Sequence, residues 1–467
     1  MKISSLLLLV CLMTIFAVSS TLADEVELEN NKPINYRNRV LVVVESTQIK
    51  TTHSRLFDEL KKAGFSVEIK LAFDSISLIK YGENVYDHLL IMAPKAKRLG
   101  GDLDDPRKIL EFIDRGHNVF IVASEDGLTQ NLRKVAIESG IELDDDGTNV
   151  IDHFNYDVKL DSDKHTTIVI KDEKQFACKK TNILGSALSK FSTQPVLFRG
   201  LGMLLKPQNK LLVPILSGAS TSYSYSTSDE RVQTEPLVKG RETVLIGANQ
   251  ARNGARLTIC GSMDLLSNQF FDASITQFSL DGNAKTFAAS GNALFSIELI
   301  RWAFQSRGLL RHTKVHHYLA DDVTKTQPTA YRVGQELTYT VSIEEWNGRD
   351  WVPYVTDDIQ LDFIMLHPYQ RVFLKFDEKA QKYSATLKAP DTYGVFKFVV
   401  DHRRHGFNQL IFADQVTVRP MHINEFERFV PAAYPYYTSV FVMMGAFVVF
   451  VIVLTFTAEP KDKQKTE

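Results

Sequence analysis

The chain has 467 residues, of which 54 are basic and 56 acidic, and 44% of its residues are hydrophobic. This near balance of charge argues against the strongly basic surface that binds nucleic acid, so nucleic acid is excluded as a partner. The length exceeds what one hydrophobic core usually serves, and we therefore expect two or three domains.

Residues 1–23 are predicted to be a signal peptide. Lys2 gives this segment a basic start, residues 6–18 are apolar but too few to span a membrane, and small residues precede a cleavage point after Ala23. Cleavage after Ser19 and an uncleaved anchor are the alternatives. A signal peptide predicts that the chain enters the secretory pathway and that most of it becomes luminal.

Residues 24–308 are predicted to form an α/β domain of the flavodoxin or Rossmann type. Residues 40–44 are a continuous apolar run, as in a strand that is covered on both faces, and residues 106–116 have the Pro start and the Gly end of a helix. Alternating strands and helices predict a parallel sheet with right-handed crossovers. The expected strands are residues 40–44, 67–71, 88–93, 119–123, 167–170, 211–216, 244–248 and 257–260, and the expected helices are residues 51–64, 106–116 and 292–305.

Residues 309–420 are predicted to form a second domain, which resembles a β-sandwich. Apolar and polar residues alternate in residues 337–344, 383–388 and 396–401, and polar turns separate these segments. A period of two residues is typical of antiparallel strands that have one face in water.

The C-terminal region is predicted to anchor the chain in a membrane. Residues 421–435 form a connector, and residues 436–457 carry no charge, which predicts one transmembrane helix of about 33 Å. Residues 458–467 would be a cytosolic tail. Lys463 and Lys465 resemble the dilysine signal that returns membrane proteins to the endoplasmic reticulum.

Two features of the predicted helix indicate its surroundings. Tyr434, Tyr436 and Tyr437 stand where an aromatic belt belongs at the luminal interface. Gly445 and Ala446 are small enough to let a neighbouring helix approach closely. Together with the signal peptide, this arrangement predicts a type I single-pass protein of the endoplasmic reticulum membrane.

The sequence lacks the motifs of several common enzyme classes. It has no glycine-rich turn after the first predicted strand for a dinucleotide, no Gly-x-Ser-x-Gly elbow and no His-Glu-x-x-His motif. His402 and His405 are three residues apart, but we interpret them as part of a solvated turn rather than as metal ligands. These observations favour a chain that has no metal, cofactor or catalytic residue of its own.

Four residues have two interpretations each. Ser262 and Asp264 follow a buried strand at the carboxyl edge of the predicted sheet, where ligands bind in open α/β folds. They line a ligand site or they cap a helix, and capping is the favoured interpretation. Cys178 and Cys260 could form a disulfide in the lumen, but a buried free thiol is favoured for Cys260.

Short segments spread over nearly the whole mature chain resemble one protein family. They are residues 52–54, 77–83, 86–87, 150–153, 155–157, 197–202, 218–224, 250–253, 261–262 with Asp264, 351–353, 393–396 and 434–437. In order, spacing and topology they resemble the 48 kDa subunits of the eukaryotic oligosaccharyltransferase. That complex transfers a preassembled oligosaccharide from dolichyl diphosphate to the asparagine of Asn-x-Ser/Thr in nascent proteins.

The resemblance implies a non-catalytic, accessory role in protein N-glycosylation. In this family, catalysis and the divalent metal belong to a different, many-spanning subunit. The implied partners are that subunit, ribophorin-type subunits, membrane lipid and, through the complex, the dolichyl-linked donor. The family's N-terminal domain resembles a sugar- or nucleotide-binding fold, which makes glycan binding near Ser262 and Asp264 an open expectation. The alternatives are a free-standing luminal enzyme that acts on glycans and a glycan or cargo receptor of the early secretory pathway.

Overall fold

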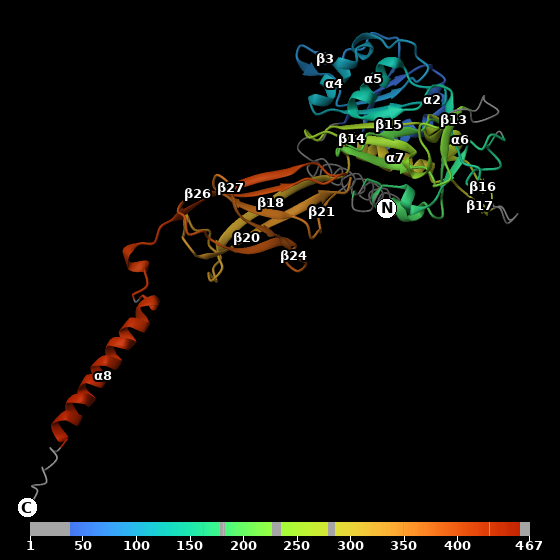
Figure 1. Ribbon diagram of the computed structural model, residues 1–467. Coiled ribbons are helices and arrows are strands. Elements are labelled where there is room, and N and C mark those ends of the chain that lie inside the picture. The colour runs from blue at the N-terminus through green and yellow to red at the C-terminus, as the bar shows by residue number, and fades with distance from the viewer. Residues whose placement is uncertain are drawn as a thin grey trace, which may run out of the picture.

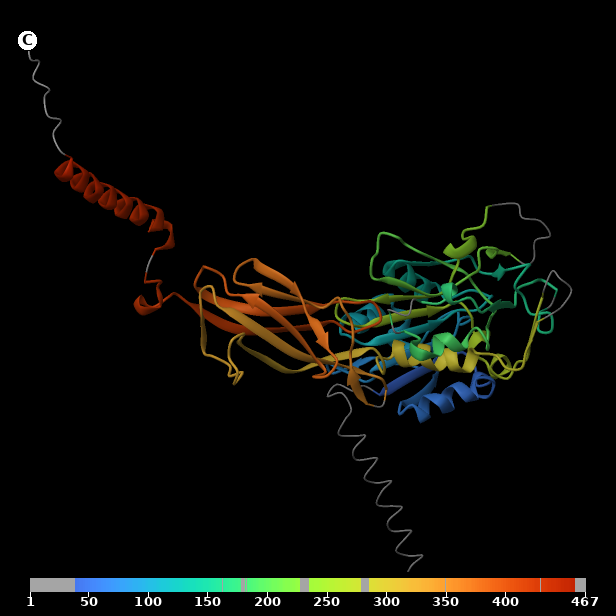
Figure 2. The same ribbon diagram turned by 90° about the horizontal axis from the view of Figure 1, so that it is seen from below.

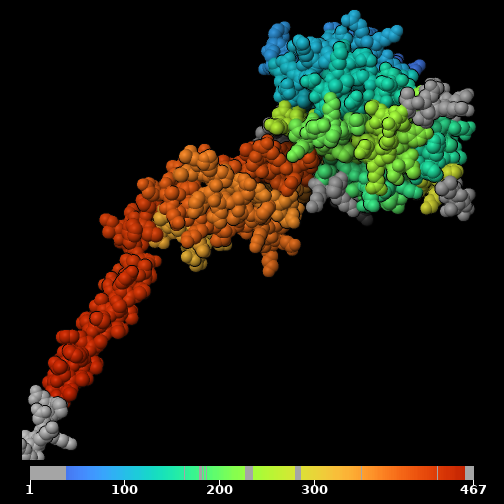
Figure 3. Space-filling model, in the orientation of Figure 1, coloured from blue at the N-terminus to red at the C-terminus, as the bar shows by residue number. Residues whose placement is uncertain are grey.

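The structure, a computed structural model, describes residues 38–457 apart from residues 162, 178–180, 182, 227–234, 279–284, 349 and 429. The predicted signal peptide and the predicted tail with Lys463 and Lys465 lie outside the described residues. An α/β domain, a β-sandwich and a long helix, α8 (Tyr434–Phe456), follow one another along the molecule (Figure 1). The space-filling view in Figure 3 shows that the sandwich separates the α/β domain from α8.

A nine-stranded sheet forms the centre of the α/β domain. One half of it is parallel, as the sequence predicts, and all of its strands except the edge strand β2 are almost completely buried because helices cover both faces of the sheet. In spatial order the parallel strands are β2 (Ser66–Leu71), β1 (Arg39–Val44), β5 (His88–Met92), β6 (Asn118–Val122) and β15 (Arg256–Cys260).

The other half of the sheet is antiparallel, so the sheet is mixed rather than wholly parallel as predicted. Only residues 251–255 join the two central strands, β14 and β15, and a connection this short makes a hairpin, not a parallel crossover. The strands of this half are β14 (Val244–Gln250), β12 (Leu212–Ser217), β11 (Met203–Leu205) and β7 (Ile141–Leu143).

Helices pack on both faces of the sheet, and alternate residues of β1 show the two layers. Val40 and Val42 belong to the core under one set of helices, whereas Leu41 and Val43 belong to the core under the other set. Figure 2 shows helices of the first set, in blue and yellow, along one side of the sheet. The first set is α2 (Ile49–Thr52), α3 (Ser54–Lys62), α6 (Asn268–Phe271) and α7 (Asn292–Ala303), and the second is α4 (Pro106–Asp114) and α5 (Gln130–Ser139).

Short antiparallel pairs complete the described part of the α/β domain. They are β3 (Ile79–Lys80) with β4 (Glu83–Asn84), β8 (Thr148–Ile151) with β13 (Tyr223–Ser226), β9 (Ile168–Ile170) with β10 (Val196–Phe198), and β16 (Ile275–Gln277) with β17 (Lys285–Phe287). Most of these strands have only two to four residues, which is too short to give a periodic signal in the sequence.

The second domain consists of two five-stranded sheets that share one core. Leu337, Tyr339 and Val341 point into this core, while Thr338 and Thr340 lie on the other face of the same strand, as the alternation predicts. The first sheet contains β18 (Leu309–Leu319), β20 (Glu336–Trp346), β21 (Trp351–Pro353), β24 (Lys375–Asp377) and β25 (Lys382–Lys388). The second contains β19 (Ala330–Arg332), β22 (Gln360–Ile364), β23 (Pro368–Phe373), β26 (Gly394–His402) and β27 (Leu410–Arg419).

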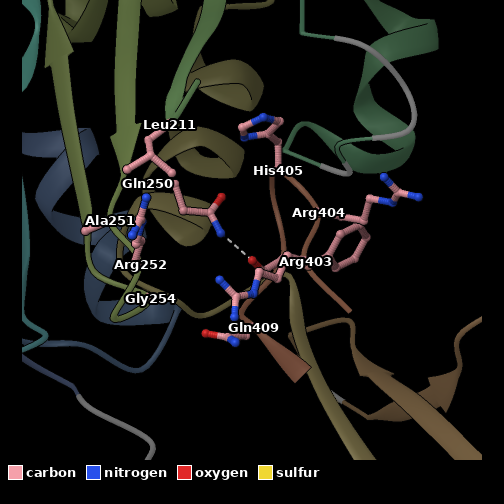
Figure 4. A pocket seen from close by; sticks show the side chains of 10 residues that line it. Leu211, Gln250, Ala251, Arg252, Gly254, Arg403, Arg404, His405 and Gln409 are labelled. Carbon is pink, nitrogen blue, oxygen red and sulfur yellow. Dashed lines mark hydrogen bonds between the residues drawn. The ribbon is translucent and has the colours of Figure 1, made fainter. Parts of the chain in front are cut away.

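The loop between β26 and β27 belongs to the β-sandwich and packs against the α/β domain. Gly406 in this loop donates its backbone N–H to Oε1 of Gln250 at 2.9 Å, and Nε2 of Gln250 donates to the carbonyl oxygen of Phe407, as the dashed line in Figure 4 marks. His402, predicted to lie in a solvated turn, is instead the last residue of β26, on the same inward face as Phe398 and Val400, and is buried beside the hydroxyl of Tyr354 at 3.3 Å. A hollow of about 280 Å³ remains at this junction, and His405 lies at its exposed side.

Arg256 is the buried centre of the same junction. Its guanidinium donates to the carbonyl oxygens of Arg307, Gly308 and Gly406 at 3.0, 3.3 and 3.2 Å and also to that of Trp302. The guanidinium carbon lies 4.7 Å from the centre of the Trp302 ring. Burial lowers the pKa of Arg256 to about 9, so the group stays charged at neutral pH. One side chain thus binds backbone from both domains.

Helix α8 is long and apolar enough to cross a membrane. Its 23 residues extend about 35 Å, none of them is charged, and none is buried against the rest of the described chain. The helix starts two residues before the predicted span. Before it, Arg419 and Glu425 form an ion pair at 2.7 Å, which fixes the start of the connector to the end of β27.

Candidate functional site

A cleft lies at the carboxyl ends of the parallel strands. Its walls come from the loops that follow β1, β5, β6 and β15, and the chain order of the strands reverses at β1, between β2 and β5. Ligands of open α/β sheets bind outside the carboxyl ends of the strands at such a reversal. The fold therefore forms a hollow at the place where the sequence predicts a ligand edge.

The cleft has two neighbouring parts. The larger has a volume of about 430 Å³ and lies between the loops after β1 and β15, and the other, of about 410 Å³, extends toward β8. Glu125, Asp126 and Arg199 line both parts. Each part alone falls within the range of volumes that small ligands occupy in proteins.

Ser262 and Asp264 take different positions at this edge. Ser262 is fully buried, donates its hydroxyl to the carbonyl oxygen of Arg199 at 2.6 Å and accepts the N–H of Leu265 at 3.1 Å. These are the contacts of a capping residue at a short turn. Asp264 lines the cleft and accepts a hydrogen bond from Nε of Arg199 at 2.7 Å. A ligand role for Asp264 remains a prediction.

His53 forms part of the wall behind Asp264. Its Nε2 lies 3.3 Å from the carbonyl oxygen of Met263, and its Nδ1 lies 2.8 Å from the hydroxyl of Thr52. Burial lowers the pKa of His53, and the contact with Met263 offsets part of this effect. The imidazole is therefore neutral at neutral pH and presents one donor and one acceptor.

Lys95, on the opposite wall, is paired with Asp126. Their charged atoms lie 2.5 Å apart, and this hydrogen bond raises the pKa of Lys95. Arg199 is likewise paired with Asp264. Over both parts of the cleft, four carboxylates face three basic side chains, which are Lys95, Lys164 and Arg199. The cleft is consequently polar, with a slight excess of negative charge.

Sequence reasoning missed the two residues with the most unusual surroundings. Ser124 follows β6 and lines the larger part of the cleft, and Asn149 belongs to β8 and lines the other part. In the described part of the chain, Oγ of Ser124 and Oδ1 of Asn149 are buried without a hydrogen-bond partner. A polar loop after the apolar run of β6 could have drawn attention to Ser124, but nothing in the sequence distinguishes Asn149.

The cleft and the rest of the described chain offer no arrangement of three His, Cys, Asp or Glu side chains that could hold a metal ion. Cys260 lies beneath the cleft with a free thiol, as favoured from the sequence, and burial raises the pKa of Cys260 to about 12. Its sulfur lies 3.2 Å from the carbonyl oxygen of Ser262. Cys178 lies outside the described residues.

Fold and site together define a class: a two-domain protein with a polar cleft in its α/β domain and one candidate membrane-spanning helix at its C-terminal side. Two family models match the chain, "OST48, N-terminal domain" over residues 32–306 and "OST48 middle domain" over residues 317–458. The chain belongs to the OST48 family.

Three relatives, each named dolichyl-diphosphooligosaccharide–protein glycosyltransferase 48 kDa subunit, are similar over nearly the full length. The zebrafish (Danio rerio) protein is 39% identical over 92% of this chain and 93% of its own length. The Caenorhabditis elegans protein is 38% identical over 89% and 91%, and the Arabidopsis thaliana protein is 36% identical over 88% and 91%.

Solved structures resemble the chain only weakly. A carbohydrate deacetylase, Agd3, has a TM-score of 0.28 at 10% identity and covers 48% of this chain and 29% of its own. A ThuA-like protein from Parabacteroides merdae has a TM-score of 0.29 at 12% identity and covers 58% of this chain and 90% of its own.

Proposed function

We propose that this chain is the non-catalytic 48 kDa subunit of an oligosaccharyltransferase, the complex that transfers a preassembled oligosaccharide from dolichyl diphosphate to asparagine in nascent proteins. The observation that carries this proposal is the similarity of 36–39% identity over about nine-tenths of both chains to relatives with that name. The α/β domain, most of the β-sandwich and α8 fall within the family models, which supports a role for the whole chain.

An accessory role agrees with the position of the cleft. The β-sandwich lies between α8 and the α/β domain that contains the cleft (Figure 1), whereas a lipid-linked donor presents its diphosphate at the membrane surface. We therefore assign catalysis and the divalent metal to a many-spanning partner subunit. Ribophorin-type subunits and membrane lipid are the other proposed partners, and the dolichyl-linked donor is reached through the complex.

The proposed location is the endoplasmic reticulum membrane, with both folded domains in the lumen. The exposed surface of α8 supports this, because an apolar helix with no buried residue needs lipid or other helices around it. Gly445 and Ala446 lie on that exposed surface and would permit close contact with a neighbouring helix. In the α/β domain, the order β2-β1-β5-β6-β15 supports a flavodoxin-like half, extended by antiparallel strands.

Purification and depletion test the subunit proposal. The tagged full-length chain, extracted from microsomes in mild detergent, is expected to elute at a fixed ratio with a many-spanning transferase. The eluate should glycosylate an Asn-x-Thr peptide, and depletion of the chain should remove most of that activity. A chain that elutes alone, with glycosylation intact after its removal, would contradict the proposal and favour a free-standing enzyme or a receptor.

The tail gives a second test of location. We propose that Lys463 and Lys465 are a retrieval signal read by a cytosolic receptor. A reporter that carries α8 and the tail but no folded domain should stay in the endoplasmic reticulum, and replacing both lysines with serine should let it move on to the Golgi. The control replaces Lys461 alone, which lies outside the dilysine spacing. Equal retention of all three reporters would refute the signal.

A further inference from the structure

Two buried polar atoms in the cleft have no partner among the described residues: Oγ of Ser124 and Oδ1 of Asn149. Ser124 is 9% exposed and Asn149 is 4% exposed, and each residue lines one part of the cleft. Buried polar atoms in folded proteins are almost always hydrogen-bonded, and an exception calls for a cause. A ligand that enters the cleft would supply the missing partners.

The two atoms flank the wall that both parts of the cleft share. Ser124 is the residue before Glu125, and Nδ2 of Asn149 lies 3.5 Å from Oε2 of Glu125. The amide of Asn149 therefore presents its oxygen as a free acceptor while its nitrogen faces a carboxylate. A hydroxyl oxygen, a carboxylate and an amide oxygen next to one another are a set of groups that binds ligand hydroxyls, because a hydroxyl can both donate and accept.

The charges in the cleft disfavour an anionic ligand. Lys95 and Arg199 are occupied by Asp126 and Asp264, at 2.5 and 2.6 Å. Glu125 adds a further negative charge at the shared wall. Outside these two ion pairs, the carboxylates of Glu45 and Glu125 outnumber the ammonium group of Lys164, so a phosphate or diphosphate would meet an excess of negative charge.

We propose that this cleft binds a neutral oligosaccharide, with ligand hydroxyls donating to Glu125 and to Oδ1 of Asn149 and accepting from Oγ of Ser124. The two neighbouring parts, of about 430 and 410 Å³, have Glu125, Asp126 and Arg199 in common, and two adjoining hollows suit a chain of several sugar units better than one compact ligand. The binding rests on the geometry of the cleft. Only the source of the oligosaccharide, the lipid-linked donor or a glycan already on protein, rests on the function proposed above.

Direct binding to the purified full-length chain in detergent tests this inference. The probes are the oligosaccharide released from dolichyl diphosphate by mild acid, a glycopeptide that carries the same oligosaccharide, and inorganic pyrophosphate. The free oligosaccharide should bind and pyrophosphate should not. Tighter binding of the glycopeptide would identify glycoprotein as the source, and equal or weaker binding would identify the donor. Binding of pyrophosphate in preference to the oligosaccharide would overturn the proposal.

Ser124→Ala provides the decisive variant, with Ser296→Ala as its matched control. Ser296 lies in α7, away from the cleft lining, and its Oγ is also buried without a partner in the described chain. Neither substitution removes a protein hydrogen bond, so both variants should fold with unchanged or raised thermal midpoints. Ser124→Ala should weaken oligosaccharide binding about tenfold, as the loss of one hydrogen bond does, and Ser296→Ala should leave it unchanged.

Asn149→Ala gives a second, independent measurement and should weaken binding at least as much. Wild-type affinity in both cleft variants would overturn the proposal. A chain that binds no oligosaccharide but still elutes with the transferase would overturn this inference and leave the subunit function intact. A chain that binds the oligosaccharide but elutes alone would support this inference and contradict the subunit function.

Discussion

Replacing Arg256 with methionine should lower the free energy of unfolding by about 3–5 kcal/mol, because it leaves four buried carbonyl oxygens without their donor and each such group costs about 1–3 kcal/mol. Methionine fills a similar volume but cannot donate a hydrogen bond. The carbonyl oxygens of Trp302, Arg307, Gly308 and Gly406 would then lose the donor that Arg256 supplies inside the junction. Buried carbonyls without partners are costly, and these belong to both domains.

Thermal unfolding in detergent, followed by tryptophan fluorescence, measures this effect because the guanidinium lies against the ring of Trp302. The control is Arg252→Met, in the exposed turn of the same hairpin, which should change stability by no more than about 0.5 kcal/mol. Arg256→Lys should resemble the methionine variant, since one ammonium group cannot reach four carbonyls arranged around a planar fork. Equal midpoints for the variants at positions 256 and 252 would show that the junction does not depend on the guanidinium.

Gly406→Ala should have the second largest effect, about 3 kcal/mol or more, through overlap of backbone atoms. A Cβ on Gly406 would lie 1.6 Å from the carbonyl oxygen of Thr181, and Gly406 has a φ of 93°. Because the overlapping atoms belong to the backbone of Thr181, they cannot move aside as the end of a flexible side chain would. The loop would have to leave the α/β domain and give up its contacts with Gln250 and Arg256.

Gly334→Ala is the matched control for this substitution. Gly334 also has a positive φ, 75°, but a Cβ there would meet nothing closer than Cε of Lys388 at 3.8 Å. It should cost about 1 kcal/mol, which is the penalty for the left-handed conformation alone. Urea unfolding and limited proteolysis at the junction would separate the two cases. Similar stability of both variants would mean that contact with Thr181 does not hold the loop.

The parts of the fold that the sequence predicts are those with a strong local signal. The apolar run of β1 requires a strand buried on both faces, and the Pro and Gly residues around α4 mark its ends. The alternation of apolar and polar residues in β20 indicates a strand with one face in water. By contrast, β7 and β11 have three residues each, so their antiparallel pairing depends on partners distant in sequence. The helix predicted at residues 51–64 is interrupted because His53 turns toward Met263.

The residues of the site divide in the same way, into those that neighbouring residues in the sequence identify and those that depend on the folded structure. The rule that ligands bind at the carboxyl edge of a sheet leads to Asp264, because that residue follows an apolar strand directly. Ser124 and Asn149 could not be selected in this way, since a missing partner is a property of the assembled fold. Arg256 is a similar case. A charged residue at the start of an apolar strand looks solvent-exposed, but Trp302, Gly308 and the loop at Gly406, all distant in sequence, surround this side chain in the folded protein.

The β-sandwich has a further consequence as a spacer of fixed height. Its long strands run from the junction toward α8 (Figure 1), and the 11 residues of β20 alone extend about 37 Å. Because Arg256 and Gly406 hold the α/β domain on top of it, the cleft stands at least that far from the start of α8. An oligosaccharide whose first sugar is attached at the membrane surface reaches the cleft only if it is long. If the cleft binds the oligosaccharide as proposed, this spacing would favour complete over truncated oligosaccharides by distance alone, without contact with the sugars that differ.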